Sequence, residues 1–482
     1  MTPISVPSLL RRVTERVPDQ AALRTRDAMG EPRDWTYAQY HEDISTVARA
    51  FISLGLQPFH TVSVLGYPSP CQHIANMASV TAGGFIGGMY QTNTEEACQY
   101  IAQDSRANII VVSDMVQLSK ILAIRSKLPD LRAIVLYDDY ENPPNIPGVF
   151  TWNQVMEIGR DQTNGPLNER LRNIAVNQCA VLGYTSGMRK DELFFKGTYL
   201  FQTSGTTGNP KGTMISHDNL VYTAKQNTDF FKWEFGVESV LSYLPQNHMA
   251  GMMMDQMMVM TKGGVCCFAD KNALKGTLLE NIQHFQPTRF MAVTRIYEKI
   301  EEGIKAKGAD TKGLRRVIVD WAKRQALSHH EQEARSGKPH SSLGYSLARK
   351  MIFSKVHQTL GFAEAQKHGF AIGAAAVSPE TVRFFLSLDM KLLEMISQTE
   401  ITAFVQLCNT PEPGGFRVGK VGREYSDQCE VKLINMDEVT QVCHNQVQYM
   451  KLSSDRCRRD AVSESGCVHG IPQQQAEDPG DD

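Results

Sequence analysis

The apolar positions of the first 150 residues follow two different spacings. In "DWTYAQYHEDISTVARAFISLGL" they recur at helical spacing, and Gly55-Leu56 ends the run. "TVSVLGY" predicts a strand, and "ANIIVVSD" and "RAIVLYDD" predict strands that are buried on both faces. Helices are predicted at "SPCQHIANMASVTAGG" and from Met115 to Lys127. Strands that alternate with helices predict an α/β fold with a largely parallel sheet, covered on both sides.

Composition narrows the class of protein. A chain of 482 residues is longer than a single hydrophobic core usually accommodates, so more than one sub-domain is expected. A net charge of -2 does not favour nucleic acid as a partner. The ten cysteines, without a recognisable secretory leader, predict reduced thiols and a cytoplasmic protein. No apolar run is long enough to span a bilayer, and the methionine-rich run from Met249 to Met260 contains Asp255. Membrane contact would therefore be peripheral, at the endoplasmic reticulum or another membrane.

The stretch "TSGTTGNPKG", from Thr203 to Gly212, indicates chemistry most strongly. "GTYLFQ" before it and "GTMIS" after it are predicted as strands, and "HDNLVYTAKQNTDFF" as a helix. Glycine tolerates the backbone angles that let N–H groups surround phosphate oxygens. The stretch lacks the Walker pattern, but its donors favour a phosphate-binding loop over a plain Gly/Ser/Thr loop. These donors and the glycines between them are Thr203, Ser204, Gly205, Thr206, Thr207, Gly208 and Lys211.

This stretch resembles the AMP-binding signature of the acyl-adenylate-forming superfamily. "LSYLPQNHMAG", "FADKNALKGTLLENIQHFQPTRFMAVTRIYEKI" and "QCEVKLINMDE" resemble bubblegum-type long-chain acyl-CoA synthetases, up to about Glu438. The resemblance implies a large N-terminal adenylation domain over residues 1–438, with parallel sheets flanked by helices. It also implies an enzyme that joins a fatty acid to AMP with ATP and Mg²⁺, and then forms a thioester with coenzyme A. The loop would hold the β- and γ-phosphates during attack on the α-phosphorus.

A second "TSG" precedes the loop, at Thr185 to Gly187. In the family, a strand such as "CAVLGYTSG" leads directly into "TTGNPKG", so residues 188–205 are expected to be an insertion. One interpretation is that the insertion restores the loop and that "TYLF" replaces the strand "AVLGY". The alternative is that the loop is displaced from the sheet and cannot function. The sequence leaves both open.

The resemblance implies further site residues. Thr399 and Glu400, in "LLEMISQTEI", match the family's "YGxTE" motif. Thr399 would contact the α-phosphate and Glu400 would bind Mg²⁺, so these two and Lys211 are the candidate catalytic residues. Taken alone, Glu400 could be a solvated charge. Ile396 replaces the tyrosine that stacks on adenine, and this loses aromatic stacking.

Two other segments are assigned to the ligand sites by the same resemblance. His248, in "YLPQNHMAG", would line or gate the acyl site, and the alternative is a histidine in an ordinary loop. In "FAIGAAAVS", small residues would form the wall beneath the acyl group and adenine. Alone, such a run could also reflect tight packing. The small residues are Gly373, Ala374 and Ala375.

The chain departs from the family after Glu438. Residues 439–482 show no "TGD" motif and no small C-terminal domain, and their polar composition predicts disorder. A zinc site formed there by cysteine and histidine is an alternative, although the spacing fits no compact finger. Two functions stay open: a long-chain-fatty-acid–CoA ligase, or a truncated, catalytically impaired isoform that binds nucleotide or fatty acid or regulates a full-length partner. No pattern indicates an oligomeric state.

Overall fold

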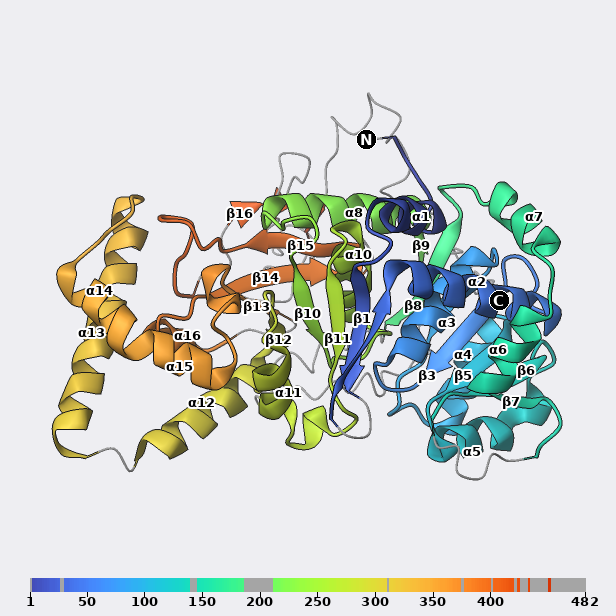
Figure 1. The fold of residues 1–482 in the computed structure, drawn as a ribbon, viewed down its shortest axis with the longest axis horizontal. Coiled ribbons are helices and arrows are strands. Elements are labelled where there is room, and N and C mark those ends of the chain that lie inside the picture. The colour runs from blue at the N-terminus through green and yellow to red at the C-terminus, as the bar shows by residue number, and fades with distance from the viewer. Residues whose placement is uncertain are drawn as a thin grey trace, which may run out of the picture.

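The fold is described here from a computed structural model of the chain. It describes residues 2–26, 30–138, 145–185, 211–309, 312–373, 377–399 and 402–419. Three short strands complete the description: β16 (Arg423–Glu424), β17 (Lys432–Leu433) and β18 (Met450–Lys451), of which the last two pair with each other. Three larger sheets with surrounding helices form the rest of the described chain (Figure 1).

A seven-stranded sheet is built from the first half of the chain, in the order β7-β6-β5-β3-β4-β8-β9. All neighbouring strands are parallel except β8 and β9, which are antiparallel. The strands are β3 (Thr61–Leu65), β4 (Phe85–Gly88), β5 (Ala107–Val112), β6 (Ala133–Leu136), β7 (Val149–Thr151), β8 (Cys179–Thr185) and β9 (Lys211–Ser216).

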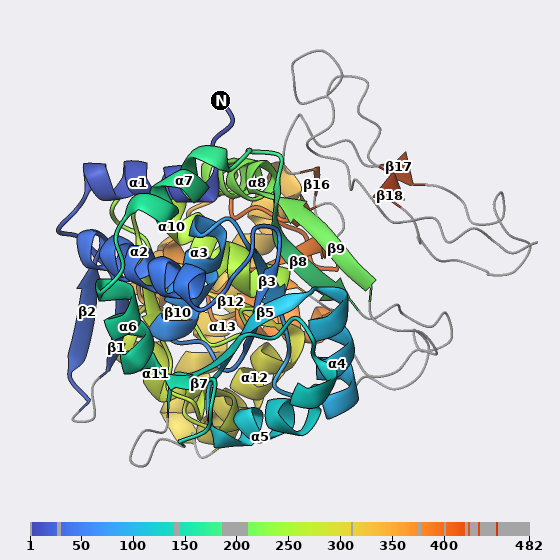
Figure 2. The same cartoon turned by 90° about the vertical axis from the view of Figure 1, so that its right-hand side faces the viewer.

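Helices cover both faces of this sheet, and Figure 2 shows them around β3 and β5. Successive residues of β5 belong to different apolar clusters: Ile109 and Val111 to one, Ile110 and Val112 to the other. The first cluster includes α2 (Tyr37–Ser53), α3 (Pro70–Thr81) and α6 (Trp152–Arg160), and the second includes α4 (Glu95–Asp104) and α5 (Met115–Ile124). The continuous apolar run of β5 is therefore explained by burial on both faces.

A four-stranded sheet, β10-β11-β1-β2, lies between the other two sheets in Figure 1. Its strands are β1 (Ala21–Arg26), β2 (Pro32–Thr36), β10 (Ser239–Ser242) and β11 (Val265–Phe268). The helices of this region and the neighbouring helix α7 are α1 (Val6–Arg16), α7 (Gly165–Asn173), α8 (His217–Phe230), α9 (Met249–Gly251), α10 (Val259–Thr261) and α11 (Leu278–Phe285). A π-helical segment, Met252–Met258, joins α9 to α10, and all seven of its residues are buried.

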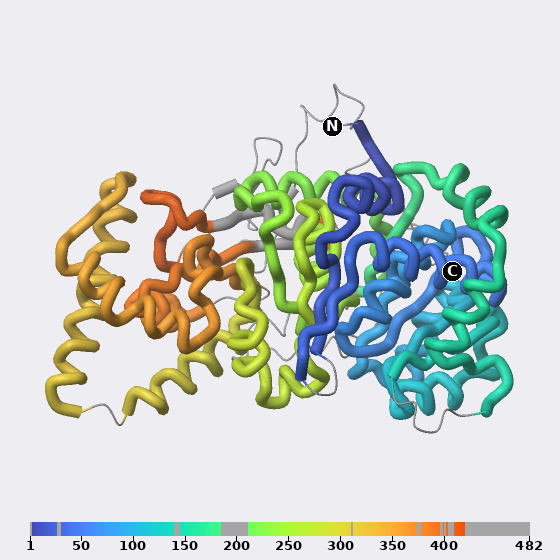
Figure 3. Tube along the Cα trace, in the orientation of Figure 1, coloured from blue at the N-terminus to red at the C-terminus, as the bar shows by residue number. Residues whose placement is uncertain are grey.

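The third sheet has the order β12-β13-β14-β15-β16. Its longer strands are β12 (Met291–Val293), β13 (Phe370–Gly373), β14 (Leu392–Gln398) and β15 (Ala403–Cys408). The accompanying helices lie at one end of the molecule, on the left in Figure 3. They are α12 (Thr294–Ala309), α13 (Gly313–Ser336), α14 (Leu343–Ala348), α15 (Ser354–Leu360) and α16 (Pro379–Leu386), with a π-helical segment, Arg349–Phe353, between α14 and α15. Short 3-10 turns occupy Arg125–Lys127, Ala273–Lys275 and Ala365–Lys367.

The predicted α/β fold is confirmed, because mostly parallel sheets are flanked by helices. One interpretation of the loop region is wrong: "AVLGY" is not replaced, since it forms β8 and pairs with both β4 and β9. "TYLF" lies outside the described residues, as does nearly all of the tail. Within the described part of the chain, no helix combines the length and apolarity needed to cross a membrane.

Candidate functional site

The β8–β9 hairpin holds both ends of the connection that contains the predicted phosphate loop. The antiparallel ladder runs from Cys179 opposite Ser216 to Thr185 opposite Lys211. Ser216 then caps α8 and completes a capping box with Asn219, which explains why the chain turns from strand to helix there. The loop residues themselves, Thr203 to Gly208, lie outside the described residues.

The end of β14 approaches this hairpin. A Cβ atom added to Gly183 of β8 would lie 3.4 Å from Cγ2 of Thr399, directly after β14. The backbone N–H of Thr402 donates to the carbonyl of Thr399 at 2.9 Å and closes the turn beyond the strand. Thr399, predicted to bind phosphate, therefore lies next to β8, the strand that pairs with the strand beginning at Lys211. Glu400 lies outside the described residues.

Lys211 is suited to an anionic ligand. It is exposed at the first position of β9, and its ammonium group has no ion-pair partner among the described residues. A neighbouring phosphate would supply such a partner, because lysine binds phosphate as a point charge. These observations fit the predicted nucleotide.

The wall segment begins at Gly373, the last residue of β13, which pairs with Val293 of β12. A Cβ atom there would meet Cγ of Met395 at 3.4 Å, an ordinary contact, so space alone does not demand glycine. On β14, the backbone of Ile396 pairs with Leu407 of β15. Ala374 and Ala375 lie outside the described residues. The contribution of this wall to nucleotide binding stays a prediction.

An apolar cavity lies between the π-helical segment and strands β13 and β14 of the third sheet. Its volume is about 30 Å³, which suits a water molecule rather than an acyl chain. Two of its lining residues, Met254 and Met258, come from the π-helical segment. Methionine side chains adapt their shape easily, so the cavity has an adjustable wall. The other lining residues are Phe231, Trp233, Arg289, Phe290, His368, Gly369, Ala371, Leu393 and Met395.

His248 caps the helix that leads into this methionine segment. Its Nδ1 accepts a hydrogen bond from the N–H of Ala250 at 3.2 Å. Burial lowers the pKa of its imidazole. His248 is not one of the residues that line the cavity, so its proposed role in gating the acyl site stays a prediction.

Asp255 is the one acidic residue of the π-helical segment, and its pKa is strongly perturbed. It is 5% exposed, and Oδ2 accepts a hydrogen bond from Nε2 of Gln246 at 2.9 Å. Burial raises the pKa of this carboxyl to about 8, although the bonds from Ser242 and Gln246 oppose the shift. Asp255 is therefore largely protonated at neutral pH.

Sequence reasoning missed the apolar cavity and a cluster on α13. The residues that line the cavity come from five separated segments of the chain, and no short sequence motif predicts such a set. The cluster consists of His329, His330 and Glu333. A signal for it existed in "SHHEQE", because residues four apart share a helix face.

Comparison with known proteins fits this geometry. The model of the family described as "AMP-binding enzyme" matches residues 10–188 and 197–447, with an interruption within the predicted insertion. Among curated relatives, long-chain-fatty-acid–CoA ligase ACSBG2 of Xenopus laevis is 34% identical, over 91% of this chain and 56% of its own length. ACSBG1 of Rattus norvegicus is 37% identical, over 83% of this chain and 52% of its own length. ACSBG2 of Homo sapiens is 32% identical, over 97% of this chain and 67% of its own length. The chain thus spans about half to two thirds of the length of these relatives.

Solved structures share the fold at lower identity. The anthranilate CoA ligase AuaEII, in complex with anthranoyl-AMP, has a TM-score of 0.62 at 18% identity, over 91% of this chain and 67% of that chain. ATP-bound MatB from Rhodopseudomonas palustris has a TM-score of 0.56 at 18% identity, over 87% of this chain and 65% of that chain. The fold is therefore that of adenylate-forming enzymes. With the family match across most of its length, this chain belongs to the AMP-binding enzyme family.

Proposed function

We propose that this chain carries the nucleotide- and acyl-binding body of a long-chain-fatty-acid–CoA ligase. The observation that carries the proposal is the approach of Thr399 to Gly183, which brings the end of β14 to the hairpin that holds the loop. The curated relatives bear that activity in their names. The reaction would activate a fatty acid with ATP through an acyl-adenylate and then form a thioester with coenzyme A.

Each predicted site residue has a proposed role that follows from the chemistry of its side chain. Lys211 and the loop donors, Ser204, Thr206 and Thr207, would bind the β- and γ-phosphates and stabilise the charge that develops during transfer. Thr399 would bind the α-phosphate and Glu400 would hold Mg²⁺ through oxygen. The ion would supply further charge neutralisation between the phosphates. The chain's own contribution is mainly positioning, because the attacking carboxylate and the α-phosphorus must be held close together.

The apolar cavity supports the assignment of an apolar acid. Ala371 on β13, Gly369 directly before that strand and Met395 on β14 line it, and both strands lead toward the predicted nucleotide site. The described cavity is too small for an acyl chain, so binding would require displacement of Met254 and Met258. An acyl chain in this position would extend away from the phosphates, as adenylation requires.

Pyrophosphate exchange tests the proposal directly, because it reports adenylation without thioester formation. The purified chain would be incubated with Mg·ATP, labelled pyrophosphate and saturated acids of increasing length. We expect exchange that depends on acid and is greatest for long chains. Exchange with short acids alone would contradict the acyl assignment. Saturable binding of ATP or fatty acid without exchange would favour the second function, a catalytically impaired isoform.

We further propose peripheral membrane contact through α13 and α14, since a ligase of long-chain acids acts on a lipid-soluble substrate. Leu314 and Val317 on α13 are 75% and 60% exposed, and Leu343 on α14 is 92% exposed. Arg315 and Arg316 lie between Leu314 and Val317 in the sequence. Apolar side chains beside arginine suit an anionic bilayer surface. Sedimentation with anionic vesicles, compared with a Leu314→Ser/Leu343→Ser variant, tests this contact. Unchanged sedimentation would contradict it.

A further inference from the structure

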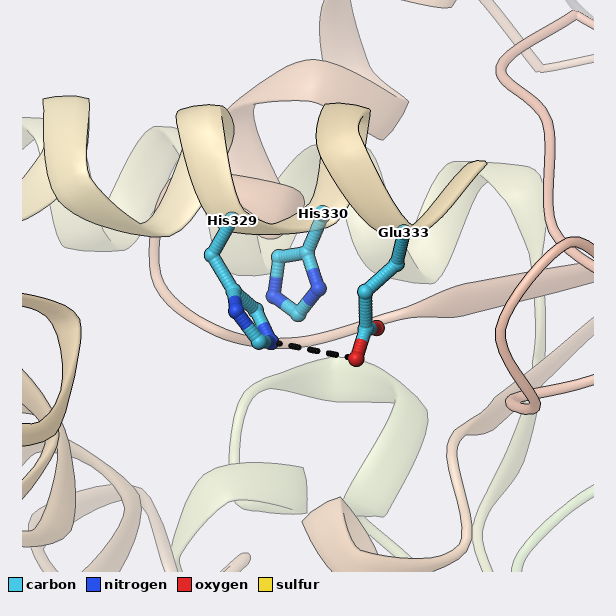
Figure 4. A group of neighbouring side chains, drawn as sticks. All are labelled: His329, His330 and Glu333. Atoms are coloured by element: carbon cyan, nitrogen blue, oxygen red, sulfur yellow. Dashed lines mark ion pairs between the residues drawn. The ribbon is translucent and has the colours of Figure 1, made fainter. Parts of the chain in front are cut away.

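A cluster of three potential metal ligands lies on α13, at the end of the molecule remote from the seven-stranded sheet (Figure 1). His329 and Glu333 are four residues apart and therefore share one face of the helix. Nε2 of His329 lies 3.5 Å from Oε1 of Glu333. Figure 4 shows the His330 ring between these two side chains. One ligand atom from each residue can be chosen so that all three lie within 4.8 Å of one another.

These distances approach those of a bound ion. Tetrahedral zinc at about 2.0–2.1 Å from its ligands places the ligand atoms roughly 3.3 Å apart. The His329–Glu333 distance already approaches this separation. The remaining adjustment is within the reach of side-chain rotation. Two imidazoles and a carboxylate form a ligand set that suits zinc and its neighbours among the divalent transition metals.

The second observation is that the cluster is buried and that some of its polar atoms lack hydrogen-bond partners among the described residues. His329 and His330 are 7% and 4% exposed, and the Glu333 side chain is 12% exposed. Nδ1 of each histidine has no hydrogen-bond partner among the described residues. A buried polar atom without a partner is costly, and an ion bound at Nδ1 of His330 would satisfy that atom. His329 would bind the ion through Nε2, the atom that faces Glu333. The cluster is therefore not a set of solvated surface side chains.

Outer contacts orient the ligands. Nε2 of His330 bonds with Oδ1 of Asp389 at 2.9 Å, and the Tyr345 hydroxyl donates to the same oxygen at 2.8 Å. If the His330 proton lies on Nε2, its Nδ1 lone pair is free for an ion. A carboxylate behind a metal-binding histidine is a common arrangement. On the other side, Lys391 donates to Oε2 of Glu333 at 3.1 Å, and Oε1 faces His329 and accepts a hydrogen bond from the N–H of His340 at 3.4 Å.

An open path reaches the cluster. His329 and Glu333 line a cavity of about 540 Å³, together with His340 and Tyr345. Arg349 also lines this cavity, but its Nε lies 3.6 Å from Oδ2 of Asp389, which partly offsets its charge. An ion entering from solvent would meet His329 and Glu333 first. Water or His340 could complete its coordination from the cavity side.

We propose that His329, His330 and Glu333 form a binding site for a divalent transition-metal ion of the zinc class. The site is separate from the predicted nucleotide site and does not depend on the proposed ligase activity. Asp389 acts as a positioning residue through His330. Lys391 and Asp389 belong to the segment that leads into β14. Because Glu333 and His330 of α13 bond to them, the ion would also stabilise the attachment of α13 to the third sheet.

Cobalt titration tests the proposal, because tetrahedral Co²⁺ has a visible absorption spectrum and Zn²⁺ displaces it. The full chain, purified and treated with chelator, would be titrated with Co²⁺ and then with Zn²⁺. We expect one saturable site per chain with the absorption of nitrogen and oxygen ligands. Glu333→Gln and His330→Gln should weaken binding roughly tenfold or more, and Asp389→Asn by about 10- to 100-fold. His284→Ala, which removes a histidine of α11 outside the cluster, should leave binding unchanged.

Two results would overturn the proposal. One is equal Co²⁺ affinity in the wild type and in both Gln variants. The other is binding accounted for by a thiolate-to-cobalt charge-transfer band, which would assign the ion to cysteines elsewhere in the chain. Glu333→Gln preserves side-chain size, and circular dichroism without metal shows whether each variant is folded. If one variant is unfolded, the other decides the outcome.

Discussion

The guanidinium of Arg289 and the carboxylate of Glu238 form a two-point ion pair inside the protein. Nη2 lies 2.7 Å from Oε1, and Nε lies 2.9 Å from Oε2. The side chains are only 6% and 2% exposed. Burial alone would raise the pKa of Glu238, but the hydrogen bonds and charge of Arg289 outweigh it and lower that pKa. Arg289 also bonds the carbonyls of Phe231 and Lys232, so it joins β10 to the end of α8.

Removal of Arg289 should therefore be costly. Arg289→Met leaves a buried carboxylate without its partner, and we expect a loss of about 3–5 kcal/mol in the free energy of unfolding. Urea denaturation measures it. Arg24→Met, which breaks a two-point pair with Asp34 at 38% exposure of both side chains, is the matched control and should cost about 1 kcal/mol or less. Equal losses in the two variants would contradict the prediction.

Stability should fall with pH because of Asp255. Its folded-state pKa, about 8, lies above its ordinary value of 3.8, so the protein folds with this carboxyl protonated. That contribution is complete below about pH 3.8 and is lost as the pH rises through 8, with a slope of about 1.4 kcal/mol per pH unit between these values. Asp255→Asn should lack this dependence. The free energy of unfolding of the variant should therefore rise relative to that of the wild type from pH 5 to pH 8.

Urea midpoints at several pH values measure this difference. Asp229→Asn serves as a control, since the Asp229 carboxylate is half-exposed and pairs with Lys225 and Lys262. Parallel pH profiles for the wild type and Asp255→Asn would contradict the assignment of a protonated carboxyl to the π-helical segment.

Lys211 should contribute to nucleotide affinity. Loss of one charge-assisted contact costs about 1.5–3 kcal/mol, so Lys211→Ala should weaken Mg·ATP binding at least roughly tenfold. Calorimetric titration measures this change. Lys225→Ala removes an exposed lysine of α8 that already pairs with Asp229, and its affinity should equal that of the wild type. Equal affinities for the Lys211 variant and the wild type would exclude the proposed phosphate contact.

The cavity at the π-helical segment should set the preferred acyl length. Met258→Ala removes part of its wall, and Met258→Trp should fill it. In pyrophosphate exchange, the first change should shift the preferred acid toward bulkier or longer chains, and the second should suppress exchange with long acids. Mg·ATP affinity is the internal control and should not change in either variant. An unaltered chain-length profile in both would place the acyl group elsewhere.

Much of the fold follows from local patterns. The strand at Ala107–Val112 and the helix at Tyr37–Ser53 were predictable because their apolar spacing matches their burial. The strand at Cys179–Thr185 illustrates the limit. Its apolar residues suit a strand, but its position in the sheet depends on pairing with β4 and β9, far along the chain. Local propensity could not decide between "AVLGY" and "TYLF".

The site was predicted only as far as its motifs reached. The sequence placed Lys211 and Thr399 in one site through resemblance, and the fold brings Thr399 next to Gly183 on the strand that pairs with Lys211's strand. The apolar cavity was not predictable, because Trp233, Met258 and Leu393 meet only after the π-helical segment has packed against the third sheet. The α13 cluster was local and could have been found from its helical spacing.

The ladder between Thr185 and Lys211 has a consequence for chain entropy. It pins both ends of a 25-residue connection, whatever the connection contains. Removal of residues 188–205 would rejoin Gly187 to Thr206 and recreate "TSGTTGNPKG" with seven residues between the same two anchors. By the logarithmic dependence of closure entropy on length, the longer connection costs only about 1 kcal/mol more than the shorter one. The hairpin can therefore carry 18 additional residues at a cost well below the stability of an ordinary domain.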